Sequence, residues 1–140
     1  MARASSALEP IVEQCWILLG EHRGPIWLCR RVRRTAGERV SVRFDGDWAL
    51  KREEKHGDVV GFLHTHPDGP AFPSTHDVRT MRSWCSAFGK PLVCLIACPE
   101  GMRGYRFDDD ESAGEMLAAV ETFSRGVVIG VDADGRQISS

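Results

Sequence analysis

The sequence lacks the long apolar run and the charge imbalance that would direct a chain to a membrane or to a polyanion. No apolar run approaches the roughly 20 residues that a membrane-spanning helix needs, so we expect no membrane partner. The formal net charge is only −2, which provides no bulk attraction to a polyanion. We therefore expect neither nucleic acid nor a membrane as a partner.

Paired cysteines are also lacking. The five cysteines are an odd number and include no Cys-x-x-Cys pair: Cys15, Cys29, Cys85, Cys94 and Cys98. No signal peptide pattern precedes them, so we expect reduced thiols and a cytoplasmic location. With 140 residues, of which 42% are hydrophobic and 27% charged, the chain has the size and composition of one globular domain. We expect a single domain over 1–140, with a shortened or disordered N-terminus at 1–9.

Apolar alternation and turn residues divide the chain into strands and a few helices. We expect strands at 11–19, 26–33, 40–44, 58–65, 91–98, 102–107 and 127–131, the last in a hairpin with 136–138, and helices at 48–55, 74–88 and 115–123. The pattern predicts an α+β fold with a mixed, mostly antiparallel sheet flanked by helices.

The stretch His64-Thr65-His66-Pro67 follows the apolar run 59–63, at the end of a predicted buried strand. Alternate side chains of a strand share a face, so His64 and His66 point the same way. A proline-rich loop then leads to Ser74, a predicted helix N-cap, and Asp77 follows in the first helical turn. Two imidazoles and a carboxylate with an open fourth position form the ligand set of a catalytic zinc site.

Each part of this pattern also has a simpler interpretation. Ser74-x-x-Asp77 resembles a capping box, in which serine and acid only satisfy exposed helix N–H groups. A His-x-His pair at the end of a strand often does no more than terminate it with polar residues. Combined at short spacing and bounded by prolines, the two patterns favour a metal site.

These residues resemble the JAMM signature of the JAB/MPN zinc metalloproteases, in which H-x-H-P is followed by S-x-x-D. The family also has an upstream glutamate in a phrase like E-x-x-G-L-x-x-G, and Glu13-Gln14-Cys15-Trp16-Ile17-Leu18-Leu19-Gly20 is similar to it. Trp16 stands where the family has glycine, a departure that could reshape the strand behind the site. The resemblance runs from about Pro10 to Phe107 and implies an MPN/JAB domain of the cytidine-deaminase-like fold.

The resemblance implies a role for each residue of the motif. His64, His66 and Asp77 would bind one Zn²⁺ ion per chain. Glu13 would act as general base on zinc-bound water and then deliver the proton to the leaving amine. Ser74 would donate a hydrogen bond to the oxyanion of the tetrahedral intermediate. Glu13 also shares its predicted strand face with apolar residues, where burial raises a carboxyl pKa toward the range of a general base.

The resemblance also implies a substrate. Family members are isopeptidases that cleave after the C-terminal tail of ubiquitin or a ubiquitin-like protein. The segment between Asp77 and Pro91 is too short for the long insertion of eukaryotic members. The chain therefore looks like the compact bacterial type, which occurs beside E1-like and E2-like proteins in conjugation and antiphage defence operons. We expect deconjugation or precursor maturation of a bacterial ubiquitin-like protein.

Other functions stay open at this point. A JAB hydrolase could instead release an amino acid or a sulfur-bearing group from a small carrier protein. RadC-like DNA-repair relatives share the motif spacing, but they usually carry an Asp-His pair in the next strand, which 91–99 lacks. The domain could also be a metal-free module that only binds a ubiquitin-like partner, although the complete set of motif residues argues against that.

Arginines crowd the predicted second and third strands: Arg30, Arg31, Arg33, Arg34, Arg39 and Arg43. We favour a solvated sheet face for this run. A contact with an acidic patch on a partner protein is the alternative. Nucleic acid fits less well, because no aromatic residues interleave with the arginines to stack on bases.

Overall fold

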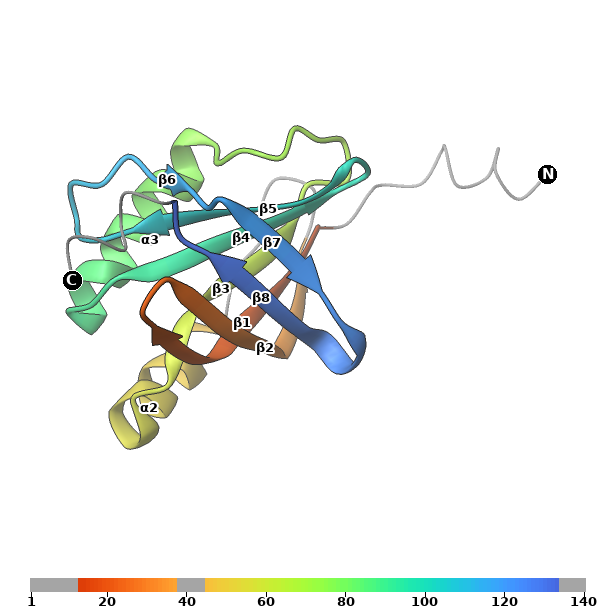
Figure 1. Cartoon of the computed structure of the whole chain (residues 1–140). Coiled ribbons are helices and arrows are strands. Elements are labelled where there is room, and N and C mark those ends of the chain that lie inside the picture. Colours follow the sequence, from red (N-terminus) through yellow and green to blue (C-terminus); the bar gives the residue numbers. More distant parts are fainter. Residues whose placement is uncertain (1–12, 38–44, 134–140) are drawn as a thin grey trace.

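The computed structural model describes residues 13–37 and 45–133 of the chain. Its centre is an eight-stranded sheet with the strand order β6-β5-β4-β3-β1-β2-β8-β7, flanked by α2 and α3 (Figure 1). Within this described part, β3 and β4 are parallel and every other neighbouring pair is antiparallel. The expected α+β class with a mixed, mostly antiparallel sheet is confirmed.

The strands and helices have the following bounds. The strands are β1 (Glu13–Arg23), β2 (Ile26–Gly37), β3 (Val59–Thr65), β4 (Leu92–Cys98), β5 (Gly101–Phe107), β6 (Glu115–Met116), β7 (Ala119–Thr122) and β8 (Val127–Val131). The helices are α2 (Gly46–His56) and α3 (Thr75–Phe88), with a short 3-10 turn η1 (Ser124–Gly126). None of the helices in the described ranges is both long and apolar enough to cross a bilayer. The expected strands at 40–44 and 136–138, and the N-terminus at 1–9, lie outside the described residues.

The expected helix over 115–123 is wrong. This segment forms the short strands β6 and β7. Leu117, between them, is buried, and a Cβ atom added to Gly104 or to Gly130 would lie 2.7 Å from its side chain. The two glycines therefore let the 117–120 segment approach the sheet closely. This tertiary packing overrides the local helical pattern.

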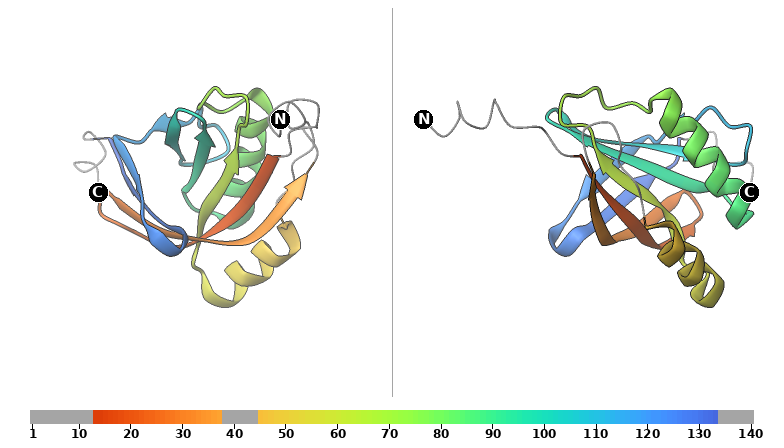
Figure 2. Two further views of the ribbon diagram at one scale, coloured as in Figure 1. Left: turned by 90° about the vertical axis from the view of Figure 1, so that its right-hand side faces the viewer. Right: turned by 180° about the vertical axis from the view of Figure 1, so that it is seen from behind.

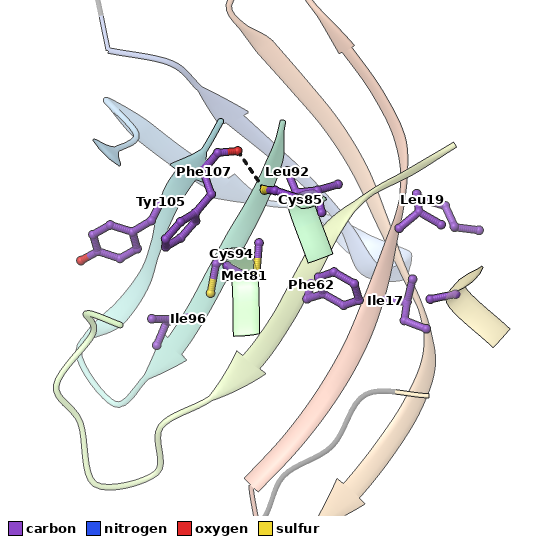
Figure 3. Close-up of a cluster of buried hydrophobic side chains, with 12 residues drawn as sticks. Ile17, Leu19, Phe62, Met81, Cys85, Leu92, Cys94, Ile96, Tyr105 and Phe107 are labelled. Atoms are coloured by element: carbon purple, nitrogen blue, oxygen red, sulfur yellow. Dashed lines mark hydrogen bonds between the residues drawn. The ribbon is translucent and has the colours of Figure 1, made fainter. Parts of the chain in front are cut away.

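The sheet is strongly curled, so that β5 and β6 approach β7 at the other end of the strand order (Figure 2). The N–H of Leu117 donates a hydrogen bond to the C=O of Gly104 at 2.8 Å, which helps to close the curl. The inner face encloses one cluster of buried residues: Leu18, Trp27, Cys29, Val60, Leu63, Val93, Leu95, Leu117 and Val128. The outer face packs against the helices (Figure 3).

Sequence signals place α3 across the outer face. Ser74 is its N-cap, and Gly89 ends it in the left-handed conformation, at φ 68°. Between these caps, Met81 and Cys85 are buried in the outer-face cluster, and the Sγ of Cys85 donates to the C=O of Phe107 at 3.3 Å (Figure 3). The apolar stripe that the spacing predicts therefore holds the helix on the sheet and fixes where its first turn lies.

The arginines of β2 lie at the surface. Arg30, Arg31, Arg33 and Arg34 are exposed, whereas the two expected on the third strand lie outside the described residues. An extra residue in β2, opposite the Cys15–Ile17 stretch of β1, forms a bulge there. At this bulge Arg33 has φ 56° and donates hydrogen bonds to Asp45 at 2.8 and 3.1 Å, which ties β2 to the N-cap of α2.

Candidate metal centre

Two antiparallel strands bring Glu13 and the histidines to one end of the sheet. Cys15 of β1 is the register partner of His64 in β3, so Glu13 at the start of β1 lies beside the end of β3. Thr65, which points to the other face of β3, accepts a hydrogen bond at its Oγ1 from the N–H of Gln14 at 2.9 Å. This contact holds the first residues of β1 against the end of β3.

The side chains of Glu13, His64 and His66 converge in space. One possible ligand atom from each lies within 4.8 Å of the others. The Nδ1 of His64 is 3.8 Å from the Oε1 of Glu13, and the two imidazole centroids are 4.7 Å apart, with the rings at 79°. The structure therefore places both histidines and Glu13 around one point in space.

The first turn of α3 adds Asp77 to the cluster. Its Oδ1 lies 3.6 Å from the Nε2 of His64, and its Oδ2 lies 3.3 Å from the Nε2 of His66. The capping box is also present: the N–H of Ser74 donates to Asp77 Oδ2 at 2.8 Å, and the N–H of Asp77 donates to Ser74 Oγ at 3.1 Å. The cap and the candidate ligand role are thus compatible, because the cap fixes the carboxylate beside the two imidazoles.

The loop after β3 orients His66. Its Nδ1 lies 2.7 Å from the C=O of Pro70. A carbonyl oxygen can only accept, so Nδ1 carries the hydrogen and Nε2 keeps its lone pair. That lone pair points into the cluster with Asp77. An imidazole whose second nitrogen is held by a backbone carbonyl is the usual arrangement of a metal ligand.

Burial and neighbouring charges set the protonation of the cluster. Burial lowers the pKa of His64 to about 4, so this imidazole is neutral at pH 7. Burial opposes the charge of Asp77, but its contacts with His66 and His64 and the hydrogen bond from the N–H of Ser74 outweigh burial and lower the pKa of Asp77 to about 2. Burial also raises the pKa of Glu13. The carboxylate of Asp77, 3.3 Å from Nε2, raises the pKa of His66. The cluster therefore combines a neutral imidazole with an ionised carboxylate.

The spacing of these donor atoms fits a divalent metal. The closest imidazole–carboxylate approaches, 3.3 and 3.6 Å, are longer than the roughly 2.9 Å of a good N–H···O hydrogen bond. Two ligands of a tetrahedral zinc ion lie about 3.3 Å apart when both bonds are about 2.0–2.1 Å long. Nitrogen donors at the end of β3 and an oxygen donor in the first turn of α3 thus lie at the separation expected for two zinc ligands.

The remaining residues of the motif are also placed by the structure. Ser74 is exposed at the N-cap of α3, and since its Oγ accepts from Asp77, its O–H remains to donate. Trp16 faces away from Glu13, packs against the inner-face cluster and lies under the guanidinium of Arg31, 4.8 Å from the ring centroid. The tryptophan in place of glycine therefore affects the opposite face of β1. No sequence signal marked Pro70, because it acts through a carbonyl that any residue has.

Comparisons with known proteins agree with this geometry. The Prok-JAB family, described as prokaryotic homologs of the JAB domain, matches residues 2–108, which include every residue of the cluster. The chain is also 33% identical over 127 residues to Desampylase from Haloferax volcanii, and the alignment covers 86% of each of the two chains. The similarity therefore extends beyond the motif to most of the chain.

Proposed function

The chain belongs to the family of prokaryotic JAB-domain homologues, and we propose that this hydrolase is a zinc-dependent peptidase or isopeptidase. Its substrate would be a bacterial ubiquitin-like protein, cleaved after the C-terminal tail in deconjugation or in precursor maturation. The observation that carries the proposal is the convergence of Glu13, His64, His66 and Asp77 from three chain segments. The similarity to a desampylase supports a deconjugating activity.

Three residues would hold the metal. His64 and His66 would do so through the Nε2 atoms that face the carboxylate of Asp77. When bound, zinc would supply a Lewis acid that lowers the pKa of a coordinated water to about 7. The Pro70 carbonyl keeps the ring of His66 in orientation, and the Ser74 N–H does the same for the carboxylate of Asp77.

Glu13 would move the proton. Its side chain lies at the rim of the cluster, with its pKa raised by burial and by the negative charge of Asp77. A carboxylate of raised basicity can accept the proton of the attacking water and deliver it to the leaving amine nitrogen. Such general acid–base catalysis contributes about 10²–10⁴-fold in rate.

Ser74 would bind the oxyanion. Its O–H lies at the N-terminus of α3, where the helix dipole also favours a negative charge. Because its Oγ already accepts from the N–H of Asp77, the position of the hydroxyl is fixed before substrate arrives. Removing one such donor lowers kcat by about 10²–10³-fold.

The test is to measure bound zinc and cleavage of a panel of Gly-Gly-terminated ubiquitin-like fusions. Glu13→Ala is expected to keep the metal and lose activity, whereas His66→Ala is expected to lose both. Glu21→Ala, an exposed position further along β1, is the matched control and should keep both. Activity that survives in Glu13→Ala or in His66→Ala would refute the proposed chemistry.

The wider setting follows from the same proposal. We propose that residues 1–140 form one JAB domain acting in the cytoplasm. E1-like and E2-like operon partners stay predictions, which the genes neighbouring this one can test. If metal binds but no ubiquitin-like fusion is cleaved, release of an amino acid or a sulfur-bearing group from a small carrier protein becomes the better candidate.

A further inference from the structure

A groove beside the candidate metal centre takes no part in the proposed chemistry. Its volume is about 200 Å³, and it lies between the first half of β5 and the segment that joins β6 to β7. Its walls include Cys98, Met102, Met116, Ala118 and Val120. Among these residues, Cys98 is partly exposed.

The groove is continuous with the loop that orients the site. Ala71 lines it, and the C=O of Ala71 accepts a hydrogen bond from the Tyr105 hydroxyl at 2.7 Å. The preceding residue, Pro70, accepts from the candidate ligand His66. Adjacent residues of one short loop thus contact a candidate metal ligand and form a wall of the groove.

The edge of β5 that faces away from β4 lines the groove. β5 pairs with β4 along its whole length but with β6 only at Tyr105 and Arg106. The C=O of Gly104 points to the β6 side, where it accepts from Leu117. Alternate residues of a strand present their backbone groups to the same side, so Met102 presents its N–H and C=O there too. Among the residues that the structure describes, no backbone group pairs with Met102 on that side.

The chemistry of the groove suits an extended polypeptide. An unpaired strand edge binds an extended segment through main-chain hydrogen bonds, while pockets beside the edge take alternate side chains. Ala71 and Ala118 leave room for a large side chain. Glu100 also lines the groove. Its carboxylate lies beside Gly69 in the loop after β3, because its Oε1 is 3.5 Å from the position that a Cβ atom would take at Gly69. The groove therefore offers a strand edge, an apolar hollow and a negative charge near the candidate metal centre.

We propose that this groove binds the leaving side of the substrate, that is, the polypeptide that carries the amine released by cleavage. Its main chain pairs with Met102, one apolar side chain fills the hollow, and the Glu100 carboxylate faces the released lysine ammonium. The inference rests on the proposed function, because only a cleaving enzyme has a leaving side. On this proposal, β5 and the 116–120 segment select which polypeptides are accepted on the leaving side of the substrate.

The first test compares two leaving groups on the same ubiquitin-like protein. One substrate carries a short lysine peptide joined through its ε-amine, and the other carries aminomethylcoumarin. Ala118→Trp fills the groove and should lower kcat/KM for the peptide substrate about tenfold, a factor equal to about 1.4 kcal/mol, while the coumarin substrate is cleaved as by the wild type. Ala87→Trp, on the exposed face of α3, is the matched control and should change neither. Equal losses on both substrates, or no loss on either, would overturn the proposal.

The second test does not depend on cleavage and so separates this inference from the proposed function. The free lysine peptide is titrated into the protein while backbone amide resonances are followed by NMR. The Met102 amide should shift in the wild type and in Ala87→Trp, and Glu100→Lys should weaken binding of the peptide but not of its acetyl-lysine analogue. Shifts confined to other parts of the molecule, or no binding at all, would overturn the proposal even if the enzyme is active.

Discussion

Two clusters of ionisable side chains lie at opposite ends of β1, and they differ in how closely their groups approach. At the start of β1 the carboxylates and imidazoles of the candidate metal centre stay 3.3–3.8 Å apart. Near its other end, Asp132 is 1% exposed and lies 2.7 Å from Trp27 Nε1, 2.9 Å from His22 Nε2 and 2.7 Å from a guanidinium nitrogen of Arg106. One cluster is spaced for an added cation, and the other is closed by its own hydrogen bonds.

The difference separates a site from a structural contact. Both carboxylate oxygens of Asp132 have partners at hydrogen-bond distance, and the His22 ring stacks on Trp27 with centroids 3.7 Å apart. A buried carboxylate held by three hydrogen-bonding side chains stabilises the fold. In the candidate metal centre, the imidazoles and carboxylates are 3.3–3.8 Å apart, which is too far for short hydrogen bonds between them. Charge and burial alone therefore do not identify a functional site, whereas donor spacing does.

Breaking the closed cluster should have the largest effect on stability. Asp132→Ala removes one of the two carboxylate partners of Arg106, the other being Asp108, and leaves a largely buried guanidinium short of one acceptor, which costs about 3–5 kcal/mol for a buried ion pair. The free energy of unfolding from urea titration should fall by that amount, while zinc content of the folded protein stays unchanged. Asp110→Ala, at an exposed loop position, should leave stability within about 0.5 kcal/mol of the wild type.

Changing Ser74 should separate its two roles. Ser74→Ala removes both the N-cap and the proposed oxyanion donor, so kcat should fall by about 10²–10³-fold and stability by about 1 kcal/mol. Ser74→Asp restores a capping acceptor but has no hydroxyl donor, so stability should recover and kcat should not. If Ser74→Asp recovers activity together with stability, the serine is only a cap.

A partly buried surface ion pair should contribute least. Arg52 donates to both carboxylate oxygens of Asp58 at 2.9 and 2.7 Å, and this hydrogen bonding lowers the pKa of Asp58. The pair therefore stabilises the protein above the unfolded pKa of an aspartate, and the stabilisation is lost as the pH falls through the lower folded pKa. Asp58→Asn should cost about 1 kcal/mol or less at pH 7 and less still near pH 3, as measured by thermal unfolding. A cost that grows toward low pH would contradict this assignment.

Much of the site could be predicted because its signals are local in the sequence. The spacing of His64 and His66 on a strand, followed by the cap at Ser74, places three side chains within a short stretch of chain. Glu13 came from the resemblance alone, since nothing in its neighbourhood marks a strand-start carboxylate as catalytic. The capping box and a ligand role for Asp77 are compatible, because the cap leaves the carboxylate 3.3 and 3.6 Å from the two imidazoles.

The rest depends on contacts between distant segments. The helix expected over 115–123 was wrong because Leu117 packs against Gly104 and Gly130, a contact that local patterns do not encode. The Asp132 cluster joins His22 to a residue 110 positions later, so no spacing rule could indicate it. Cys98, at the end of β4, lines a groove that lies where β6 is too short to pair with the first half of β5.

The most direct measurement is the metal content and X-ray absorption spectrum of the purified protein. The account predicts one zinc ion per chain, bound by two imidazole nitrogens and by oxygen ligands at about 2.0–2.1 Å, with binding lost in Asp77→Ala. A protein that binds no zinc, or a zinc ion with a sulfur ligand at about 2.3 Å from one of the cysteines, would contradict it.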